Sequence, residues 1–259
     1  MAIQKTEAFV LKTSPFRSSS LIVTTFSRFF GKVKGVAKGV RQPGSLQASA
    51  FEPFTLIEMV FYEKTRSELH LISEVSILDS FEKLRTDLEV LATAYSITEL
   101  VDFLTEPHDP HESIFELLHL TFDLLPSLPP SFLARFFEVR LLHEIGLLPH
   151  LESCIACGER SPEKVYFSIK QGGIFCPRCR SKSPEARVIH LEALEAMRFF
   201  IERGAAEIAR FTLKGETEKE MRDVIEKFLI ERLGKELKAR RFLAQVRSVR
   251  KQSPSIHKA

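Results

Sequence analysis

The chain has 259 residues, 44% of them hydrophobic, which is enough for two or three domains with sizeable cores. No apolar run approaches the ~18 residues that a membrane-spanning helix needs. The first residues also lack the apolar stretch of a secretion signal. These features exclude a membrane-spanning protein and lead us to expect a cytoplasmic one.

The net charge is only +3, but it is distributed unevenly along the chain. Residues 1–50 hold eight Lys and Arg against one acid, residues 81–150 hold four against twelve, and residues 232–259 hold nine against one. A basic head and a basic tail on either side of an acidic middle favour a polyanionic partner at the two ends. The alternative is that these charge runs only solvate the surface.

Residues 1–80 have the pattern of a small β-domain, with alternating or β-branched apolar runs separated by turn residues. The expected strands are 3–11, 21–26, 32–40, 54–62 and 68–78. Five strands in this length predict a five-stranded OB-fold barrel. In such barrels strands two and three, together with the loops expected at 12–18 and 64–66, line the nucleic-acid groove.

The third expected strand carries the most informative charge pattern. Because side chains alternate faces along a strand, Lys32, Lys34 and Lys38 share one face. Three lysines on one face repel one another unless a negative partner lies there, so we expect them to bind phosphates. Arg17, Arg28 and Arg41 are close in sequence and could extend this group. A solvated barrel face is the alternative.

Two nearby aromatic residues, Phe16 and Phe29, are candidates for stacking on bases, which does not depend on base sequence. Core packing is the interpretation that we favour for both, because Phe is mostly a buried residue.

From about residue 81 the apolar residues recur at helical spacing. Expected helices are 84–104, 111–125, 131–148, 190–203, 216–233 and a basic one at 235–250. Short Pro-rich links between the first three predict an antiparallel bundle. We therefore expect an OB-fold domain at 1–80 and a helical domain at 81–259, interrupted at 150–189. Arg135 and Arg140, basic exceptions in an acidic region, are expected in surface ion pairs or against an acidic partner.

All four cysteines lie in the interruption, as Cys154 and Cys157 followed by Cys176 and Cys179. Two CxxC pairs separated by a β-hairpin match the two-knuckle pattern of a zinc ribbon. Two disulfides and a thioredoxin-type redox pair are the alternatives, and the spacing favours zinc over both. Four thiolates would fill the coordination sphere, so we expect a structural Zn²⁺ and no catalytic one.

The order of these parts, and several stretches within them, resemble the bacterial recombination mediator family RecO. The stretches are 31–33, 37–41, 51–54, 137–142, 146–149, Gly172 with Gly173, and the four cysteines. The resemblance spans nearly the whole chain, and only the cysteines are specific when taken alone.

This resemblance implies a non-enzymatic DNA repair protein that acts at the nucleoid. Such a protein would bind single- and double-stranded DNA without sequence preference and anneal complementary strands. Its partners would be RecR and the acidic C-terminal tail of single-strand binding protein (SSB), and it would help RecA load on SSB-coated DNA. Arg135 and Arg140 are then candidates for the contact with that tail.

Two other functions are open on the sequence alone. An OB-fold also suits an RNA-binding or ribosome-associated protein. A zinc-bearing nucleic-acid enzyme would need a carboxylate cluster or an activated nucleophile, and we find no motif of either kind.

Overall fold

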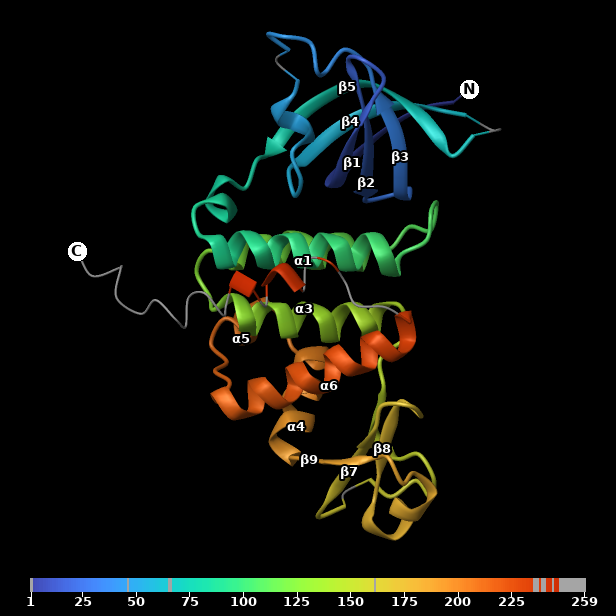
Figure 1. Ribbon diagram of the computed structural model, residues 1–259, viewed down its shortest axis with the longest axis vertical. Helices are drawn as coiled ribbons and strands as arrows, with labels where there is room; N and C mark the ends of the chain where they lie inside the picture. Colours follow the sequence, from blue (N-terminus) through green and yellow to red (C-terminus); the bar gives the residue numbers. More distant parts are fainter. Residues whose placement is uncertain are drawn as a thin grey trace, which may run out of the picture. The chain divides into compact units, whose positions relative to one another are not determined.

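The computed structural model describes residues 2–45, 47–64, 67–160, 162–234, 238, 241–243 and 245–246. Contacts within the chain divide it into two compact units (Figure 1). The first, Met1–Pro126 with Leu237–Ala259, is called the barrel unit, and the second, Ser127–Glu236, is called the ribbon unit. Helices α1 (Leu88–Leu104) and α2 (Glu112–Leu124) thus belong to the barrel unit, while α3 (Pro130–Glu144) belongs to the ribbon unit.

The barrel unit begins with a closed five-stranded sheet in the order β1-β2-β3-β5-β4. All neighbouring strands are antiparallel except β3 and β5. This confirms the predicted OB-type barrel. The strands are β1 (Ala2–Phe16), β2 (Ser20–Ser27), β3 (Gly31–Ala37), β4 (Leu56–Glu63) and β5 (Leu69–Asp79).

Alternation along the strands fills the barrel, because every second side chain points inward. The interior is lined by small and branched apolar residues with few polar atoms. Its buried members include Ala8, Val10, Val23, Val33, Ala37, Ile57, Met59, Phe61 and Ile72.

Two helices, α1 (Leu88–Leu104) and α2 (Glu112–Leu124), cover one side of the barrel. Asp87 caps α1 by accepting hydrogen bonds from two backbone N–H groups of its first turn. Phe9 points out of β1 into an aromatic cluster with Phe81, Phe115 and Phe122, at ring separations of 5.0–6.1 Å. This cluster fixes the helices to the barrel.

The loop between α1 and α2 also touches the start of β3. The His108 N–H donates to the Lys32 carbonyl at 3.3 Å. Gly31 has a φ of +61°, and a side chain there would overlap the backbone of Asp109. Glycine is therefore required by both the turn and the close approach of the loop.

The ribbon unit packs α3 (Pro130–Glu144) against α4 (Leu191–Glu202) and α6 (Gly215–Leu233), next to a short α5 (Ala205–Ile208). Phe200 of α4 joins Phe132, Phe136 and Phe211 in one aromatic cluster. A four-stranded sheet in the order β6-β8-β7-β9 carries the cysteines. Its strands are β6 (His150–Cys154), β7 (Val165–Ser168), β8 (Gly173–Phe175) and β9 (Arg187–Ile189).

Several expected bounds differ from the structure. Strand β3 ends at Ala37, three residues before the predicted end, because the chain turns at Gly39 with a φ of +73°. Strands β6 and β9 were not predicted, since three to five residues at a sheet edge give little periodic signal. The expected hairpin tip at 64–66 and the basic helix at 235–250 lie largely outside the described residues. Among the residues that the structure describes, no helix combines the length and apolar character of a membrane span.

Candidate nucleic-acid surface and metal centre

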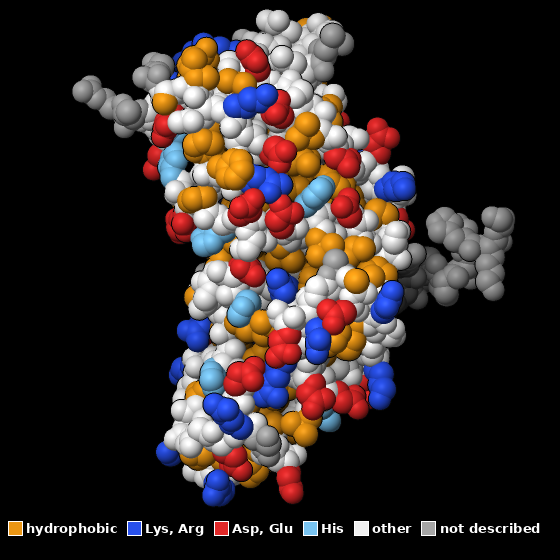
Figure 2. Space-filling view, turned by 180° about the vertical axis from the view of Figure 1, so that it is seen from behind, with side chains coloured by type: hydrophobic (Ala, Val, Ile, Leu, Met, Phe, Trp, Pro, Cys, Tyr) orange, Lys and Arg blue, Asp and Glu red, His pale blue; other side chains and the backbone are white. Residues whose placement is uncertain are grey.

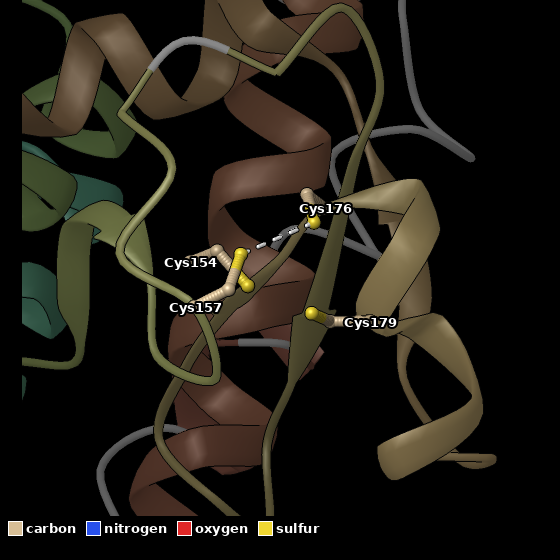
Figure 3. Close-up of side chains that lie close together, drawn as sticks. All are labelled: Cys154, Cys157, Cys176 and Cys179. Atoms are coloured by element: carbon tan, nitrogen blue, oxygen red, sulfur yellow. Dashed lines mark hydrogen bonds between the residues drawn. The ribbon is translucent and has the colours of Figure 1, made fainter.

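The four cysteines converge from two segments (Figure 3). Cys154 ends β6 and Cys157 follows in a tight turn completed by Gly158 at a φ of +77°. Cys176 follows β8, and Cys179 lies in the 3₁₀ turn that comes next. All four Sγ atoms lie within 4.8 Å of one another.

This arrangement fits a tetrahedral metal ion. A Zn–S bond of ~2.3 Å places the sulfurs of such a site about 3.8 Å apart. The Sγ atoms of Cys157 and Cys176 are 3.7 Å apart, well beyond the ~2.05 Å of a disulfide bond. All four cysteines are free thiols. Together they could hold one metal ion with no position left for water.

The protein environment shifts the pKa values of the Cys154 and Cys176 thiols in opposite directions. Burial by itself raises the pKa of the Cys154 thiol, but backbone N–H groups of Cys176, Ala156 and Cys157 lower it to about 6. Burial and a hydrogen bond with Glu159 raise the pKa of the Cys176 thiol to about 12. Because a metal needs all four as thiolates, ion binding must displace protons from this cluster.

Arg178 lies close enough to the cluster for the charges of Cys176 and Cys157 to act on its guanidinium. Its guanidinium donates to the Glu159 carboxylate at 3.2 Å. A four-thiolate site carries a net negative charge even with a divalent ion, so a cation at this position offsets part of it. We note that Arg178 and Glu159 come from different CxxC segments and thereby link them.

Four of the predicted cations stand exposed on the barrel: Arg17, Lys34, Lys38 and Arg41. Lys34 points outward from β3, and Lys38 follows directly after the strand ends. Leu21 of β2 pairs with Ala37 of β3, so the end of β3 lies beside the turn between β1 and β2. Arg17 is in that turn, which brings it into the neighbourhood of Lys38.

Arg41 is tied to the same turn by two bonds. Its N–H donates to the Ser19 carbonyl at 2.9 Å, and its guanidinium reaches the Arg17 carbonyl at 3.5 Å. The Arg17 guanidinium lies over the Phe16 ring at 5.3 Å. The exposed residues Arg17, Lys34, Lys38 and Arg41 are called the cationic surface from here on. On the face drawn in Figure 2 the two signs of charge are interspersed, so contacts must be assigned residue by residue.

Two family models together cover nearly the whole chain. Residues 1–81 match the model described as "Recombination protein O N terminal", and residues 85–241 match "Recombination protein O C terminal". The chain belongs to the RecO family.

Curated relatives match the chain over nearly all of their own lengths. The DNA repair protein RecO of Halalkalibacterium halodurans is 32% identical over 247 residues, which cover 95% of this chain and 96% of the relative. That of Anaeromyxobacter sp. strain K is 34% identical over 244 residues, covering 93% and 96%. That of Symbiobacterium thermophilum is 31% identical, covering 96% and 100%.

Within this RecO-family barrel, Lys32 is placed differently from the other predicted cations. Its ammonium donates to the carbonyls of Asp102 and Thr105 at 2.5 and 2.7 Å, and its side chain is only 15% exposed. Burial lowers the pKa of Lys32, and the nearby Asp102 carboxylate opposes that shift. The Lys32 charge is thus occupied in capping the C-terminal end of α1.

The two arginines assigned to an acidic partner are also engaged inside the RecO-family fold. Arg135 is buried, contrary to the expected surface position, and donates to Glu138 at 2.8 Å. Arg140 donates to the Ile201 carbonyl at 2.9 Å, at the end of α4, and pairs with Glu144. Helical periodicity could not reveal this, because the pattern shows a face but not its neighbour.

Phe16 and Phe29, which we expected to pack in the core, are both at least partly exposed. Phe29 is 58% exposed at the tip of the β2–β3 turn, and Phe16 is half-buried under Arg17. Phe29 follows Arg28, whose guanidinium is bonded to Glu7, Glu112 and Glu116. This acidic neighbourhood makes Phe16 the better placed of the two for a nucleic acid.

Proposed function

We propose that this RecO-family chain is a non-enzymatic mediator of DNA repair and recombination. It binds single- and double-stranded DNA without sequence preference and anneals complementary strands. The observation that carries this proposal is the gathering of Arg17, Lys38 and Arg41 at one turn of the barrel, with Lys34 exposed further along β3. Phosphates are held by such cations while the bases stay free to pair.

Strand annealing is the direct test. Complementary oligonucleotides are mixed with the protein in the absence of nucleotide and of Mg²⁺, and duplex formation is followed by fluorescence quenching. Acceleration is expected. No acceleration would contradict the annealing role, cleavage that needs Mg²⁺ would favour a nucleic-acid enzyme, and tighter binding of structured RNA would favour an RNA-binding protein.

The cationic surface makes a quantitative prediction. Each phosphate contact to a single strand contributes about 0.7 to the slope of log affinity against log salt. Replacing Lys34, Lys38 and Arg41 by alanine should therefore reduce that slope by about 2 and weaken binding of all sequences alike. Fluorescence anisotropy at several salt concentrations measures it.

The matched control removes exposed lysines elsewhere on the barrel unit. Lys5 of β1 is paired with Glu58 of β4, and Lys83 lies before α1. The Lys5→Ala/Lys83→Ala variant should keep the wild-type slope. Equal slopes for the control and the triple variant would place DNA elsewhere on the molecule.

Partners come from the family to which the chain belongs. We infer that the protein binds RecR and the acidic tail of SSB, and that it thereby assists RecA at the nucleoid in the cytoplasm. Of the two candidate arginines for that tail, Arg140 is the more accessible, since Arg135 is buried. Calorimetric titration with a peptide of the SSB tail tests this, and an Arg140→Ala variant of unchanged affinity would remove Arg140 from the contact.

We further propose that the four cysteines hold one structural Zn²⁺. The ion would cross-link β6 with the segment after β8, and its filled coordination sphere leaves it no catalytic role. The single supporting observation is the 4.8 Å cluster of four free thiols. Elemental analysis should find one zinc per chain, and Cys154→Ser/Cys157→Ser protein should hold none.

A further inference from the structure

A cleft opens on the barrel where β3 and β5 part. The two strands pair in parallel only from Lys34 to Ala37 and from Leu69 to Ile72. β3 then ends, while β5 continues to Asp79 along β4. The cleft that results has a volume of about 230 Å³.

The walls of the cleft are divided by chemistry. Its apolar part includes the buried residues Phe51 and Ile72 and the half-buried Val75. Its lining also includes three exposed residues, Lys38, Gln47 and Glu74, whose side chains end in an ammonium, an amide and a carboxylate. The remaining lining residues are Ala37, Leu71 and Ser73.

Lys38 belongs to both the cleft and the cationic surface. A strand whose phosphates lie on Lys38 therefore passes the mouth of the cleft. Beside each phosphate, such a nucleic-acid strand carries a base, which is a flat ring with apolar faces and a hydrogen-bonding edge. The cleft offers the complement of that ring, with apolar walls and, among its lining residues, an amide and a carboxylate that can pair with base edges.

The volume of the cleft limits the size of the group that can occupy it. Pockets for drug-sized ligands are typically ~300–1,000 Å³, so this cleft suits a single ring system. A base inside a duplex is stacked and paired, and it would have to be flipped out to enter. An unpaired base needs no such disruption.

We propose that this cleft takes one unpaired base of a bound single strand, with Lys38 on the adjacent phosphate. The proposal rests on the proposed DNA-binding function and deepens it. It gives the protein a contact that a single strand can make and a duplex cannot. The cationic surface by contrast holds both forms of DNA through their phosphates.

The test fills the cleft. Val75→Phe places a larger side chain in the apolar part, and Ile77→Phe is its matched control. Ile77 is two residues further along β5, is 43% exposed and does not line the cleft. For Val75→Phe we expect about tenfold weaker binding of a single-stranded oligonucleotide, the size of one lost base-stacking contact. Binding of a duplex of the same length should stay within about twofold, as should both affinities of the control.

A second readout follows one base directly. Oligonucleotides that carry 2-aminopurine at successive positions should show a change of fluorescence on binding to wild-type protein as that base leaves its neighbours. The change should be absent with Val75→Phe and present with Ile77→Phe. Circular dichroism establishes that both variants are folded.

Because Val75 contacts the barrel core, a second variant avoids the core altogether. Gln47→Trp enlarges an exposed lining residue of the cleft and should reproduce the selective loss for single strands. Equal losses for single strand and duplex, or no loss with either variant, would overturn the proposed base site. Wild-type protein that binds neither form of DNA would instead contradict the DNA-binding function, which separates that failure from failure of the base site.

Discussion

Lysine 32 shows how the same residue type takes two roles on one strand. Lys34 is exposed to solvent, whereas Lys32 reaches under the C-terminal end of α1 and donates to two backbone carbonyls. Those carbonyls have no partner within their own helix, so the ammonium satisfies groups that would otherwise be buried unpaired.

Replacing Lys32 by methionine should therefore lower the free energy of unfolding by about 1–3 kcal/mol, because hydrogen bonds to a charged donor are lost. Lys34→Met should change it by less than about 0.5 kcal/mol, as is usual for exposed positions. Urea unfolding measures both. A Lys32→Met protein as stable as wild type would contradict the capping role and leave Lys32 a candidate for DNA binding.

Histidine 70 makes the barrel unit sensitive to pH. Its Nδ1 accepts a hydrogen bond from the Lys64 N–H at 3.2 Å, and its ring lies 5.3 Å from that of His108. Burial and then the neighbouring His108 lower the pKa of His70 below the ordinary 6.5, while Glu63 opposes the shift. A folded state that resists protonation is stabilised above pH 6.5 and loses that stabilisation as the pH falls below it.

We expect the free energy of unfolding of the wild type to decrease as the pH is lowered from 6.5 and the imidazole becomes charged. His70→Gln should be less stable at neutral pH, since a buried ring is lost, but its stability should vary less with pH. Chemical unfolding at intervals of pH measures this. His150→Gln, at an exposed position, serves as the control and should retain the wild-type dependence.

At the scale of elements, the ribbon is attached to α6 through a glycine. Gly172 turns the β7–β8 hairpin with a φ of +67°, and a side chain on it would meet the Arg232 guanidinium at 2.5 Å and the Phe228 ring at 3.3 Å. Arg232 in turn stacks on Phe228. A side chain at residue 172 would require the Arg232 guanidinium to move and the Phe228 ring to shift slightly.

Gly234 provides a control of equal backbone strain, because it has the same φ of +67° and open space around it. Gly234→Ala should cost about 1 kcal/mol from strain alone. Gly172→Ala should cost more, since it adds the overlap with Arg232 and Phe228. Thermal unfolding of the two variants separates the terms, and equal losses would mean that Arg232 moves aside without consequence.

At the scale of the whole molecule, the two units depend differently on metal. The four-cysteine cluster lies wholly in the ribbon unit, where Tyr166 and Phe175 pack against it. The barrel core contains none of these residues. Loss of a structural ion should therefore destabilise the ribbon unit, Ser127–Glu236, before the barrel unit.

Treatment with a strong chelator should raise amide hydrogen exchange across residues 150–189 and leave the exchange of the barrel strands unchanged. Mass spectrometry of peptic fragments measures both regions in one sample. Cys154→Ser should show the raised exchange before any chelator is added. Faster exchange in the barrel as well would show that the metal stabilises the entire chain.

The fold could be predicted in outline from the sequence because its signals are local. Five alternating runs gave the barrel, helical spacing gave α1 to α4 and α6, and the two CxxC pairs gave the cysteine cluster. Each follows from a period of the backbone or from a short motif. Shorter elements such as β9, at three residues, leave too little pattern to detect.

The sequence by itself thus determined three features: the barrel with lysines along its third strand, the helices, and four thiols at metal-binding spacing. Only the tertiary structure decided which charges remain available. Lys32 and Arg135 are occupied by Asp102 and Glu138, whereas Lys34 and Lys38 stay exposed. The physical reason is that a period along one element fixes the face of a side chain, while its partner comes from an element that folding brings alongside.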